Sequence, residues 1–315
     1  MLILSRSEVE RLLDLDELIE ALAAAMSDLS AGRASSPPRV AAQIPERAAF
    51  LGAMPARVPS SDALTSKLVS VFPQNTTLPT HQAVIAAFDP ETGEPTAFLD
   101  GTAITALRTA AGSALSTRLL AREDATTLAI LGTGVQARAH AQALPRVRAF
   151  TEIRVVGRDR AKAEAFAAEI GGTAMSSFAA ACDGADVVCA TTHADEPVVL
   201  RDHLSPGTHV TSVGFNPTGR EVDPATVADA LVAVESRESA LAPVPAGSLD
   251  LADANPDDVV EIGELLDGVR TGRTSPDELT LYKSVGVAVQ DAAATALVLR
   301  AALEQGAGLE VDIQD

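Results

Sequence analysis

Residues 128–144 read LAILGTGVQARAHAQAL, and this stretch decides the fold. An apolar run typical of a strand buried on both faces leads into Gly132-Thr-Gly134-x-x-Ala137, and a helical pattern begins at about Val135. Backbone N–H groups of such a turn, together with the helix amino terminus, can face a pyrophosphate. A GxGxxA motif alone is a weak signal, but this one has a strand before it, a helix after it and a second strand about 20 residues on. We therefore predict a dinucleotide site; the alternative is a glycine-tightened turn in an α/β protein that binds another ligand.

The end of the second strand reads Val156-Gly157-Arg158-Asp159-Arg160. An acidic residue at this place usually hydrogen-bonds the adenosine ribose of NAD, whereas here Gly157 leaves room and Arg158 adds positive charge. That combination suits a 2'-phosphate, so the sequence favours NADP as the cofactor. NAD remains the alternative, because a small backbone shift would bring Asp159 to the ribose.

Strand-like and helical patterns alternate through residues 119–284. The runs LAIL, IRVV, DVVCA, HVTSV and LVAVE are nearly continuous in apolar residues, and helical patterns begin at about Val135 and Arg160. Apolar strands separated by helices indicate a parallel sheet that is covered on both faces. We predict an α/β protein in which this segment forms a Rossmann-type, doubly wound parallel sheet.

The flanking residues, 1–118 together with 285–315, predict a second, α+β domain. Residues 7–31 have apolar side chains at helical spacing after Ser7, with Glu10 three positions on, and predict one capped amphipathic helix. Further patterns predict strands at about 48–56, 64–73, 82–89 and 96–100 and helices at about 102–122 and 284–306. We expect a mainly antiparallel sheet, with the last helix packed back on the N-terminal part.

Composition limits the classes of partner. The chain has 43 Asp and Glu against 24 Lys and Arg, and its net charge of −19 would repel a nucleic-acid backbone or an anionic membrane. No window approaches the roughly 18 apolar residues that span a bilayer, and no signal-like segment opens the sequence, so we expect a cytoplasmic protein. Cys182 and Cys189 lie in an apolar stretch without a second pair or a nearby His set, so we expect two core thiols and no metal site.

Several segments resemble the ornithine cyclodeaminase and mu-crystallin family, which includes ornithine and lysine cyclodeaminases, alanine dehydrogenases and ketimine reductases. The resemblance covers nearly the whole chain, and its ordered set of motifs is far more specific than the glycine turn alone. The matching segments are SSPPR, SKLVSVFPQN, LPT, AITALRTAAGSALS, GTGVQARAH and GELLDGVRTGRTSPDELTLYKSVGVAVQD.

The resemblance implies roles for individual residues. Arg39, Lys67 and Arg108 match family residues that hold the carboxylate and reacting nitrogen of an amino or imino acid, and Val285 lies on the substrate side. An Arg fork pairs bidentately with a carboxylate, and Lys adds a charge or a proton donor. The remaining matched positions line the cofactor in the family: Thr80, Arg108, Thr109, Val135, Gln136, Thr192, Val213, Gly214 and Ser284. The family's usual dimer uses the N-terminal sheet, so we also expect a homodimer.

The segment SVGFNPTGREVD, residues 212–223, departs from the family pattern. In the cyclodeaminases, an Asp two residues after the glycine acts as the catalytic acid-base, and Asn216 stands at that position here. An amide cannot take a proton from an amine near neutral pH. Glu221 or Asp223 is the alternative carboxylate, if the shorter segment displaces one of them toward the site. His81, next to Thr80, is a second departure, read either as a pocket-edge residue or as a proton relay.

These observations favour an NAD(P)H-dependent reductase of a small imino acid, such as pyrroline-2-carboxylate or piperideine-2-carboxylate, or an amino-acid dehydrogenase. An imine needs only a hydride from the cofactor and one proton, which Lys67 can hold or supply, with Asn216 as the second candidate catalytic residue. The alternatives are an ornithine cyclodeaminase, which is an NAD-dependent ammonia-lyase, an alanine dehydrogenase, and a low-turnover NADPH-dependent binding protein resembling mu-crystallin.

Overall fold

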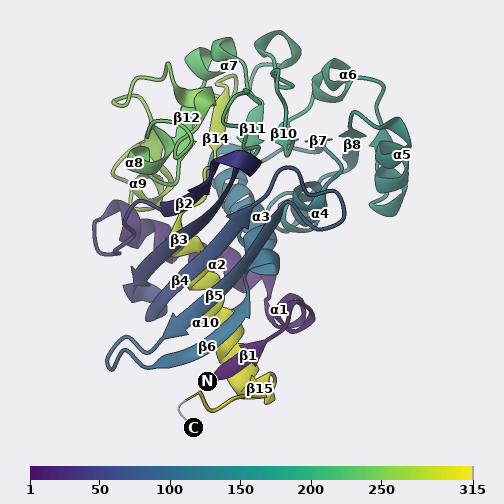
Figure 1. Ribbon diagram of the computed structural model, residues 1–315. Coiled ribbons are helices and arrows are strands. Elements are labelled where there is room, and N and C mark those ends of the chain that lie inside the picture. The colour runs from purple at the N-terminus through teal and green to yellow at the C-terminus, as the bar shows by residue number, and fades with distance from the viewer. Residues whose placement is uncertain (314–315) are drawn as a thin grey trace. The chain divides into compact units, whose positions relative to one another are not determined.

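The computed structural model describes residues 1–313 and divides them into two compact units (Figure 1). The sheet unit contains Met1–Arg108 and the chain from Val287 onward, and the Rossmann unit is Thr109–Gly286. The chain passes between them inside helix α3 (Gly101–Leu120) and again between Gly286 and Val287. The domain boundaries predicted at 118/119 and 284/285 stay a prediction, because only separate folding of the two parts would test them.

The sheet unit is built on a mainly antiparallel sheet, as predicted, with the strand order β15-β1-β6-β5-β4-β3-β2. Neighbours from β2 to β6 pair antiparallel, and β1 adds to β6 in parallel. The strands are β1 (Leu2–Leu4), β2 (Val40–Ile44), β3 (Ala49–Val58), β4 (Ala63–Val71), β5 (His81–Phe88), β6 (Pro95–Asp100) and β15 (Leu309–Glu310). The 3-10 helices η1 (Pro45–Arg47) and η2 (Pro59–Ser61) connect β2 to β3 and β3 to β4.

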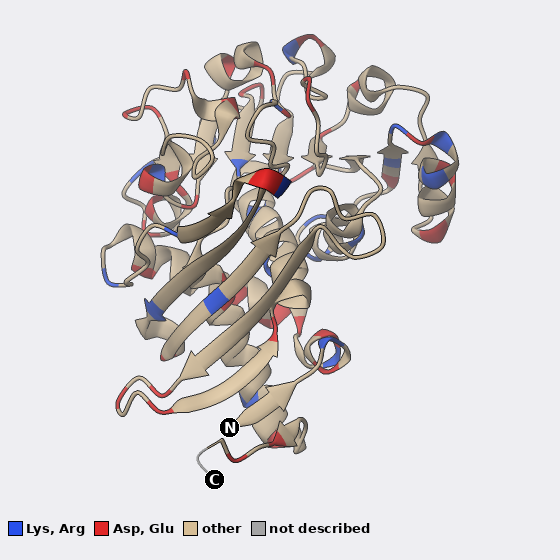
Figure 2. Cartoon of the chain, viewed as in Figure 1, with Lys and Arg blue, Asp and Glu red and all other residues tan. Residues whose placement is uncertain are grey.

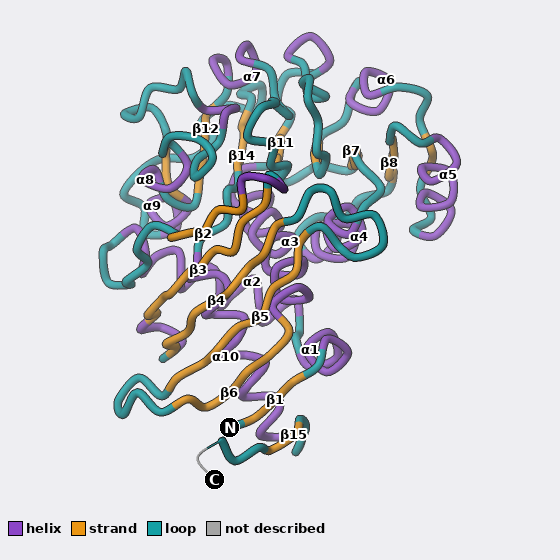
Figure 3. The backbone as a smooth tube through the Cα atoms, in the orientation of Figure 1, coloured by secondary structure: helices purple, strands orange, loops and turns teal. Residues whose placement is uncertain are grey.

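One face of this sheet packs against helices. Met54, Lys67 and Ile85 stand opposite one another across β3, β4 and β5, and all three are buried. Helix α10 (Ala288–Gln305) contacts β3, β4 and α2 (Leu15–Ser30), which confirms that the last helix packs back on the N-terminal part (Figure 3).

The other face of the sheet presents apolar side chains to solvent. Val40, Leu51, Leu68 and Phe98 are 67%, 48%, 37% and 37% exposed. Figure 2 shows strands β3–β6 with almost no charged positions, and the sequence places only Arg57, Lys67 and Asp100 there.

The single helix predicted for residues 7–31 is wrong, because the structure has two helices, α1 (Arg6–Leu12) and α2. The break comes at Asp14, whose Oδ1 accepts hydrogen bonds from the backbone N–H groups of Asp16 and Glu17, both at 2.9 Å. An acidic N-cap satisfies two of the amide groups that a helix leaves unpaired at its start. The periodic apolar pattern continued across this cap and hid it.

The Rossmann unit is built on a parallel sheet with the order β9-β8-β7-β10-β11-β14-β12-β13, which confirms the predicted fold class. The strands are β7 (Thr127–Leu131), β8 (Glu152–Val156), β9 (Thr173–Ala174), β10 (Val187–Ala190), β11 (His209–Ser212), β12 (Leu231–Val234), β13 (Val260–Glu261) and β14 (Thr280–Lys283). The order reverses between β7 and β10, and ligands of doubly wound sheets bind outside the carboxyl ends of the strands at such a point. Strand β14, inserted between β11 and β12, was not predicted.

Short helices connect these strands, and an apolar core lies between them and the sheet. The helices are α4 (Val135–Ala143), α5 (Arg160–Glu169), α6 (Phe178–Cys182), α7 (Pro224–Asp229), α8 (Arg237–Ala240) and α9 (Ile262–Leu266), with the 3-10 helices η3 (Leu144–Arg146), η4 (Arg201–His203) and η5 (Leu249–Leu251). Cys182 and Cys189 are both fully buried free thiols, as predicted. Burial raises the pKa of Cys182 to about 12.

Within residues 1–313, no helix is long and apolar enough to cross a membrane. In the same residues, no group of three or more His, Cys, Asp or Glu side chains is arranged to hold a metal ion.

Candidate functional site

The glycine turn follows strand β7 directly, at the reversal of strand order. Gly132 has φ +125, and a Cβ placed there would lie 2.5 Å from Thr191 Oγ1, so both the backbone conformation and the space require glycine. Gly134 is the N-cap of α4 and makes no side-chain cap. A Cβ on Gly134 would meet no atom within 4 Å, so the amino terminus of α4 faces open space.

The groups around this open space suit the pyrophosphate of a dinucleotide. The first amide groups of α4 have no side-chain cap, and the helix dipole favours an anion at that end. Gln136 Oε1 is buried with no hydrogen-bond partner, so a polar group is available there to a ligand. Val135, the first residue of α4, is 68% exposed. The predicted positions Gly132, Gly134, Val135 and Gln136 thus lie together.

A cavity of about 250 Å³ extends from this turn along the end of β8 and the loop after β10. It is lined by Gly132, Thr133, Gly134, Gly157, Arg158, Asp159, Lys162, Phe178, Thr191, Thr192, His193, Ala194 and Val198. Gly157 lies against Thr133, since a Cβ on it would come within 2.9 Å of Thr133 Cγ2. Arg158 is exposed at the wall of the cavity.

Asp159 is the N-cap of α5. Its Oδ1 accepts a hydrogen bond of 3.1 Å from the backbone N–H of Lys162, and its Oδ2 lies 3.7 Å from Lys162 Nζ. The carboxylate therefore caps the helix, and the cavity wall carries the side chains of Arg158 and Lys162 beside it.

The loops that follow β10 and β11 carry the next predicted cofactor residues. Thr192 lies two residues beyond β10, and Val213 and Gly214 come directly after β11. The Val213 N–H donates to the Ala190 carbonyl at 3.0 Å, so the start of the second loop is tied to the end of β10. Carboxyl ends of neighbouring parallel strands meet at one edge, which explains why residues distant in sequence gather here.

Glu221 does not reach toward an open site, and neither does Asp223. Glu221 is 3% exposed, and its carboxylate accepts four hydrogen bonds from Thr192, Ser212 and Gly214. Asp223 caps α7 by accepting the Thr226 N–H at 2.9 Å. The alternative in which one of these carboxylates replaces the missing Asp is therefore wrong.

The amide of Asn216 connects its own loop, after β11, to the loop after β10. Its Nδ2 donates to the Ala194 carbonyl and to Asp195 Oδ1, both at 2.9 Å, and its Oδ1 accepts from the N–H and Oγ1 of Thr218, both at 3.0 Å. Every hydrogen-bonding direction of the amide is used locally. Asn216 thus ties the loops after β10 and β11 together, and all of its hydrogen-bonding groups are engaged.

In the sheet unit, Lys67 and Arg108 converge on one buried carboxylate. Lys67 Nζ lies 2.6 Å from Asp291 Oδ2, and Arg108 Nε lies 3.1 Å from Asp291 Oδ1. Arg108 Nη1 also donates to Gln290 Oε1 at 2.9 Å. All four side chains are at least nine-tenths buried, and they come from β4, α3 and α10. Two cations share one carboxylate, so the cluster is one positive charge in excess, as an anion-binding group requires.

Burial also lowers the pKa of Lys67. Loss of solvent lowers the pKa of Lys67 from 10.5 to about 8; Asp291 opposes this shift, and the charges of Arg108 and Arg39 add to it. An ammonium with this pKa releases a proton near neutral pH far more readily than an exposed lysine. The electrostatic effect of Arg39 on Lys67 places Arg39 in the same charged neighbourhood.

The remaining predicted residues, Thr80, Thr109, Ser284 and Val285, lie at other places in the two units. Thr80 ends the loop before β5, and its Oγ1 lies 3.2 Å from His81 Nδ1, with both residues exposed. Thr109 is buried in α3. Ser284 and Val285 follow β14, where the carboxylate of Glu235 accepts from Ser284 Oγ at 2.5 Å and from the Val285 N–H at 3.2 Å.

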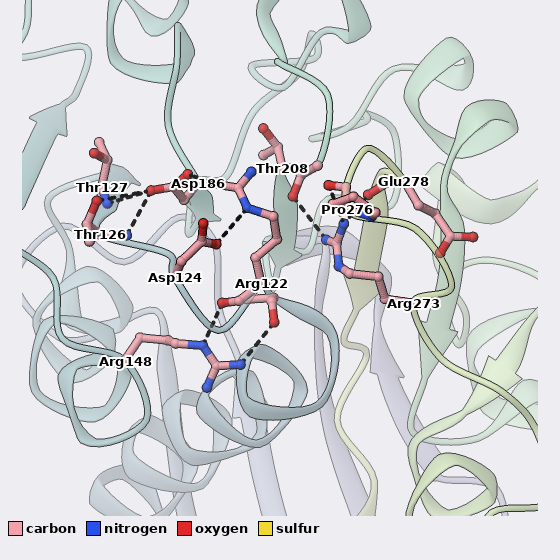
Figure 4. A network of polar contacts seen from close by, with 12 residues as sticks. Arg122, Asp124, Thr126, Thr127, Arg148, Asp186, Thr208, Arg273, Pro276 and Glu278 are labelled. Carbon is pink, nitrogen blue, oxygen red and sulfur yellow. Dashed lines mark hydrogen bonds and ion pairs between the residues drawn. The ribbon is translucent and has the colours of Figure 1, made fainter.

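Arginines at the opposite, amino-terminal edge of the parallel sheet have a different role (Figure 4). Arg118, Arg122, Arg148 and Arg273 line a cavity of about 610 Å³. Arg148 donates to the carbonyls of Arg118, Ala121 and Arg122, and Arg273 donates to that of Leu120. These bonds satisfy the last carbonyls of α3, where cations are favourable, so the network stabilises the helix end.

Sequence reasoning missed how the predicted residues are supported: Asp291, Gln290 and Glu235 were not singled out, and Glu221 was considered only as an alternative acid. Asp291 and Gln290 position Lys67 and Arg108, Glu221 holds Thr192 and Gly214, and Glu235 holds Ser284. Most of these polar side chains lie in apolar or irregular stretches, where the sequence does not show which group each one contacts. Lys162 and His193 at the cavity wall were also missed.

Known proteins resemble this chain in sequence and in fold. The family model for the ornithine cyclodeaminase/mu-crystallin family matches residues 1–306. Ketimine reductase mu-crystallin of Mus musculus is 38% identical over 289 residues, covering 89% of this chain and 90% of that protein.

Two solved structures share the fold over nearly their whole length. Thermococcus litoralis Δ1-pyrroline-2-carboxylate reductase in complex with NADH and L-proline has a TM-score of 0.93 and 35% identity, covering 99% of this chain and 100% of that one. An archaeal alanine dehydrogenase dimer with bound NAD has a TM-score of 0.92 and 31% identity, covering 99% of both chains. The predicted resemblance is confirmed, and the chain belongs to the ornithine cyclodeaminase/mu-crystallin family.

Proposed function

We propose that the protein reduces a small imino acid to the L-amino acid with a nicotinamide dinucleotide, acting on ketimines such as pyrroline-2-carboxylate or piperideine-2-carboxylate. The observation that carries the proposal is the buried cluster of Lys67, Arg108 and Asp291, which combines excess positive charge with a lysine whose pKa is about 8. The relatives named above act on ketimine or pyrroline-2-carboxylate, as their names state.

Each residue of the cluster has a distinct task in this reaction. Arg39 and Arg108 bind the substrate carboxylate, and Lys67 holds or supplies the proton that the substrate nitrogen needs. Asp291 keeps both buried cations in place, because removing it would leave them unpaired in a site of low polarity. Val285 lines the substrate side. The reduced nicotinamide supplies the hydride when it is bound.

The residues after β11 disfavour ornithine cyclisation. The cyclodeaminases that the chain resembles have an Asp as the acid-base at the position of Asn216. Asn216 is an amide whose groups are all engaged, and Glu221 and Asp223 are committed elsewhere. Reduction of an imine needs no such carboxylate.

The test is an enzyme assay with purified protein and NADPH or NADH. The substrates are pyrroline-2-carboxylate, piperideine-2-carboxylate, pyruvate with ammonia, and ornithine, and the absorbance of the reduced nicotinamide is followed. Oxidation of the cofactor with a cyclic imine is expected, and Lys67→Met should abolish it while cofactor affinity is kept. Arg300→Met, an exposed change on the same helix as Asp291, is the control. Proline and ammonia from ornithine with catalytic NAD, and no imine reduction, would instead identify a cyclodeaminase.

For the cofactor, we propose a preference for NADPH over NADH. Gly157 occupies the place of the usual ribose-binding acid, Arg158 and Lys162 line the cavity, and Asp159 is occupied as the cap of α5. These positive side chains suit a 2'-phosphate. The remaining predicted contacts, from Thr80, Thr109, Thr192, Val213, Gly214 and Ser284, belong to the same proposal.

We also propose a homodimer that forms through the exposed face of the β2–β6 sheet. Exposed apolar side chains on four strands form a surface of the kind that protein interfaces cover. The structurally similar alanine dehydrogenase is described as a dimer.

A further inference from the structure

The carboxylate of Glu221 joins two loops that belong to different strands. Its Oε1 accepts from the N–H and Oγ1 of Thr192, at 2.5 and 2.7 Å, in the loop after β10. Its Oε2 accepts from Ser212 Oγ at 2.7 Å and the Gly214 N–H at 2.8 Å, at the end of β11. One side chain thereby holds together the ends of two adjacent strands.

Lys283 extends this connection to a third strand. Its ammonium lies 2.9 Å from Asp250 Oδ2 and donates to Ser212 Oγ at 2.9 Å and the Gly214 carbonyl at 2.8 Å. The side chain is 1% exposed and comes from the end of β14, the neighbour of β11. Its three protons match three acceptors, so an ammonium in this place is fully satisfied.

Asp250 completes the network from η5. Its Oδ1 accepts the N–H groups of Glu221 and Val222, at 2.7 and 2.9 Å, and its Oδ2 accepts from Ser248 Oγ at 2.8 Å. The backbone of Glu221 is therefore fixed by Asp250, while its side chain fixes the two loops. We call Glu221, Lys283 and Asp250 the buried clasp.

The chemistry of the clasp cannot be exchanged for neutral groups of the same shape. The backbone N–H groups of Thr192 and Gly214 can only donate, and Ser212 Oγ accepts from Lys283, so Glu221 must accept on both oxygens. A glutamine at position 221 would place its NH2 group against the donors of Thr192 or against those of Ser212 and Gly214. The packing is equally close, since a Cβ on Gly214 would lie 2.3 Å from the Thr192 carbonyl.

We propose that Glu221 is a positioning residue for the dinucleotide, and that Lys283 and Asp250 hold it in the orientation in which it fixes Thr192 and Gly214. This inference rests on the proposed cofactor site, because Thr192 lines the cavity beside the glycine turn. Glu221 itself touches neither cofactor nor substrate. Its effect reaches the cofactor through the placement of the two loops, as a supporting residue does in a preorganised site.

The test is NADPH affinity of Glu221→Gln, measured by titration of NADPH fluorescence in the absence of substrate. The titration is run well below the melting temperature of each variant, as measured by circular dichroism. We expect Kd for NADPH to rise about tenfold or more, because donors are left unpaired behind the loops. Glu238→Gln, an exposed change in the same unit, should leave Kd unchanged.

A purely structural role would lower the melting temperature of Glu221→Gln and leave Kd as in the wild type, and that result would overturn the proposal. If Glu221→Gln does not fold, Ser212→Ala removes the link between Lys283 and Glu221. A smaller rise in Kd is expected from this variant, because Glu221 keeps its bonds to Thr192 and Gly214. An unchanged Kd for folded Ser212→Ala would then overturn the proposal.

Binding without substrate separates this inference from the proposed reaction. Wild-type protein that binds NADPH but reduces no imino acid would refute the reductase and leave the clasp testable by the same titration. Wild-type protein that binds neither NADPH nor NADH would refute the cofactor site and the clasp together.

Discussion

Lys67 combines two properties that an exposed lysine does not have: full burial and a carboxylate shared with a second cation. Burial favours the neutral amine, whereas Asp291 favours the ammonium, and the outcome is a pKa of about 8. The protonated form therefore dominates below about pH 8 and is lost as the pH rises through that value. A residue that donates a proton to the substrate is competent only on the acid side of its pKa.

We accordingly predict that kcat for imine reduction falls as the pH rises through about 8. Lys67→Arg should keep the positive charge but lose the proton donor, because a guanidinium does not titrate in this range, and kcat should fall by about 10²- to 10⁴-fold. The measurement is kcat at saturating substrate between pH 6 and 10. A flat profile through pH 8, or a Lys67→Arg enzyme that retains its rate, would show that Lys67 contributes charge alone.

Arg158 allows a second prediction at the level of a single side chain. Because it lines the cavity beside Gly157, Arg158→Ala should weaken NADPH binding by about tenfold or more, since a charge-assisted contact with a phosphate is lost. NADH has no 2'-phosphate, so its Kd should change little. Equal effects on the two Kd values would contradict the assignment of a 2'-phosphate to Arg158.

The sequence identifies the candidate substrate and cofactor residues better than it identifies the residues that support them. Gly132 and Gly134 are recognisable because a motif between a strand and a helix has few interpretations. Asp291 was not recognised, because it lies 183 residues after Arg108 in an apolar helix and only the fold brings the two together. Glu221 was noticed as a carboxylate, but its inward direction depends on donors from β10 and β11 that no local pattern reveals.

At the level of elements, periodicity predicted the longer strands and helices α3, α4, α5 and α10, but it missed the short helices α6 to α9. Strands β7, β8, β10 and β11 were found because buried parallel strands are continuous apolar runs. Strand β14 was missed because its residues, TLYK, are not a continuous apolar run, although all four are buried. The start of α2 was missed because the apolar pattern continues across Asp14, its cap.

Two buried histidines make the Rossmann unit sensitive to acid. Burial lowers the pKa of His140, on α4, to about 4 and that of His209, on β11, to about 3, from an ordinary value of 6.5. Because the folded pKa is depressed, the unfolded chain binds more protons between these values and 6.5. The free energy of unfolding should therefore fall below pH 6.5, by up to about 1.4 kcal/mol per pH unit for each histidine.

The check is urea unfolding between pH 7.5 and 5. His209→Asn, which cannot be protonated there, should show a shallower fall in unfolding free energy than the wild type even if it is less stable at pH 7.5. An unfolding free energy that does not change across this range would contradict the buried, neutral state of both rings.

For the whole molecule, the exposed face of the β2–β6 sheet is an apolar surface that the described residues leave accessible to solvent. Leu68 lies on this face, directly after Lys67 on the opposite face, so the proposed dimer interface and the proposed substrate site use opposite sides of β4. We predict that the protein is a dimer in solution and that Leu68→Glu weakens it by about 2 kcal/mol or more, because a charge would be buried without a partner. Sedimentation over a range of concentrations measures the dimer, with Leu303→Glu, a change at an exposed leucine on α10, as the control.

If the dimer forms elsewhere, Leu68→Glu will sediment as the wild type does. If the face serves no partner, the wild type will be a monomer. Loss of the dimer in Leu68→Glu but not in Leu303→Glu would place the interface on the sheet.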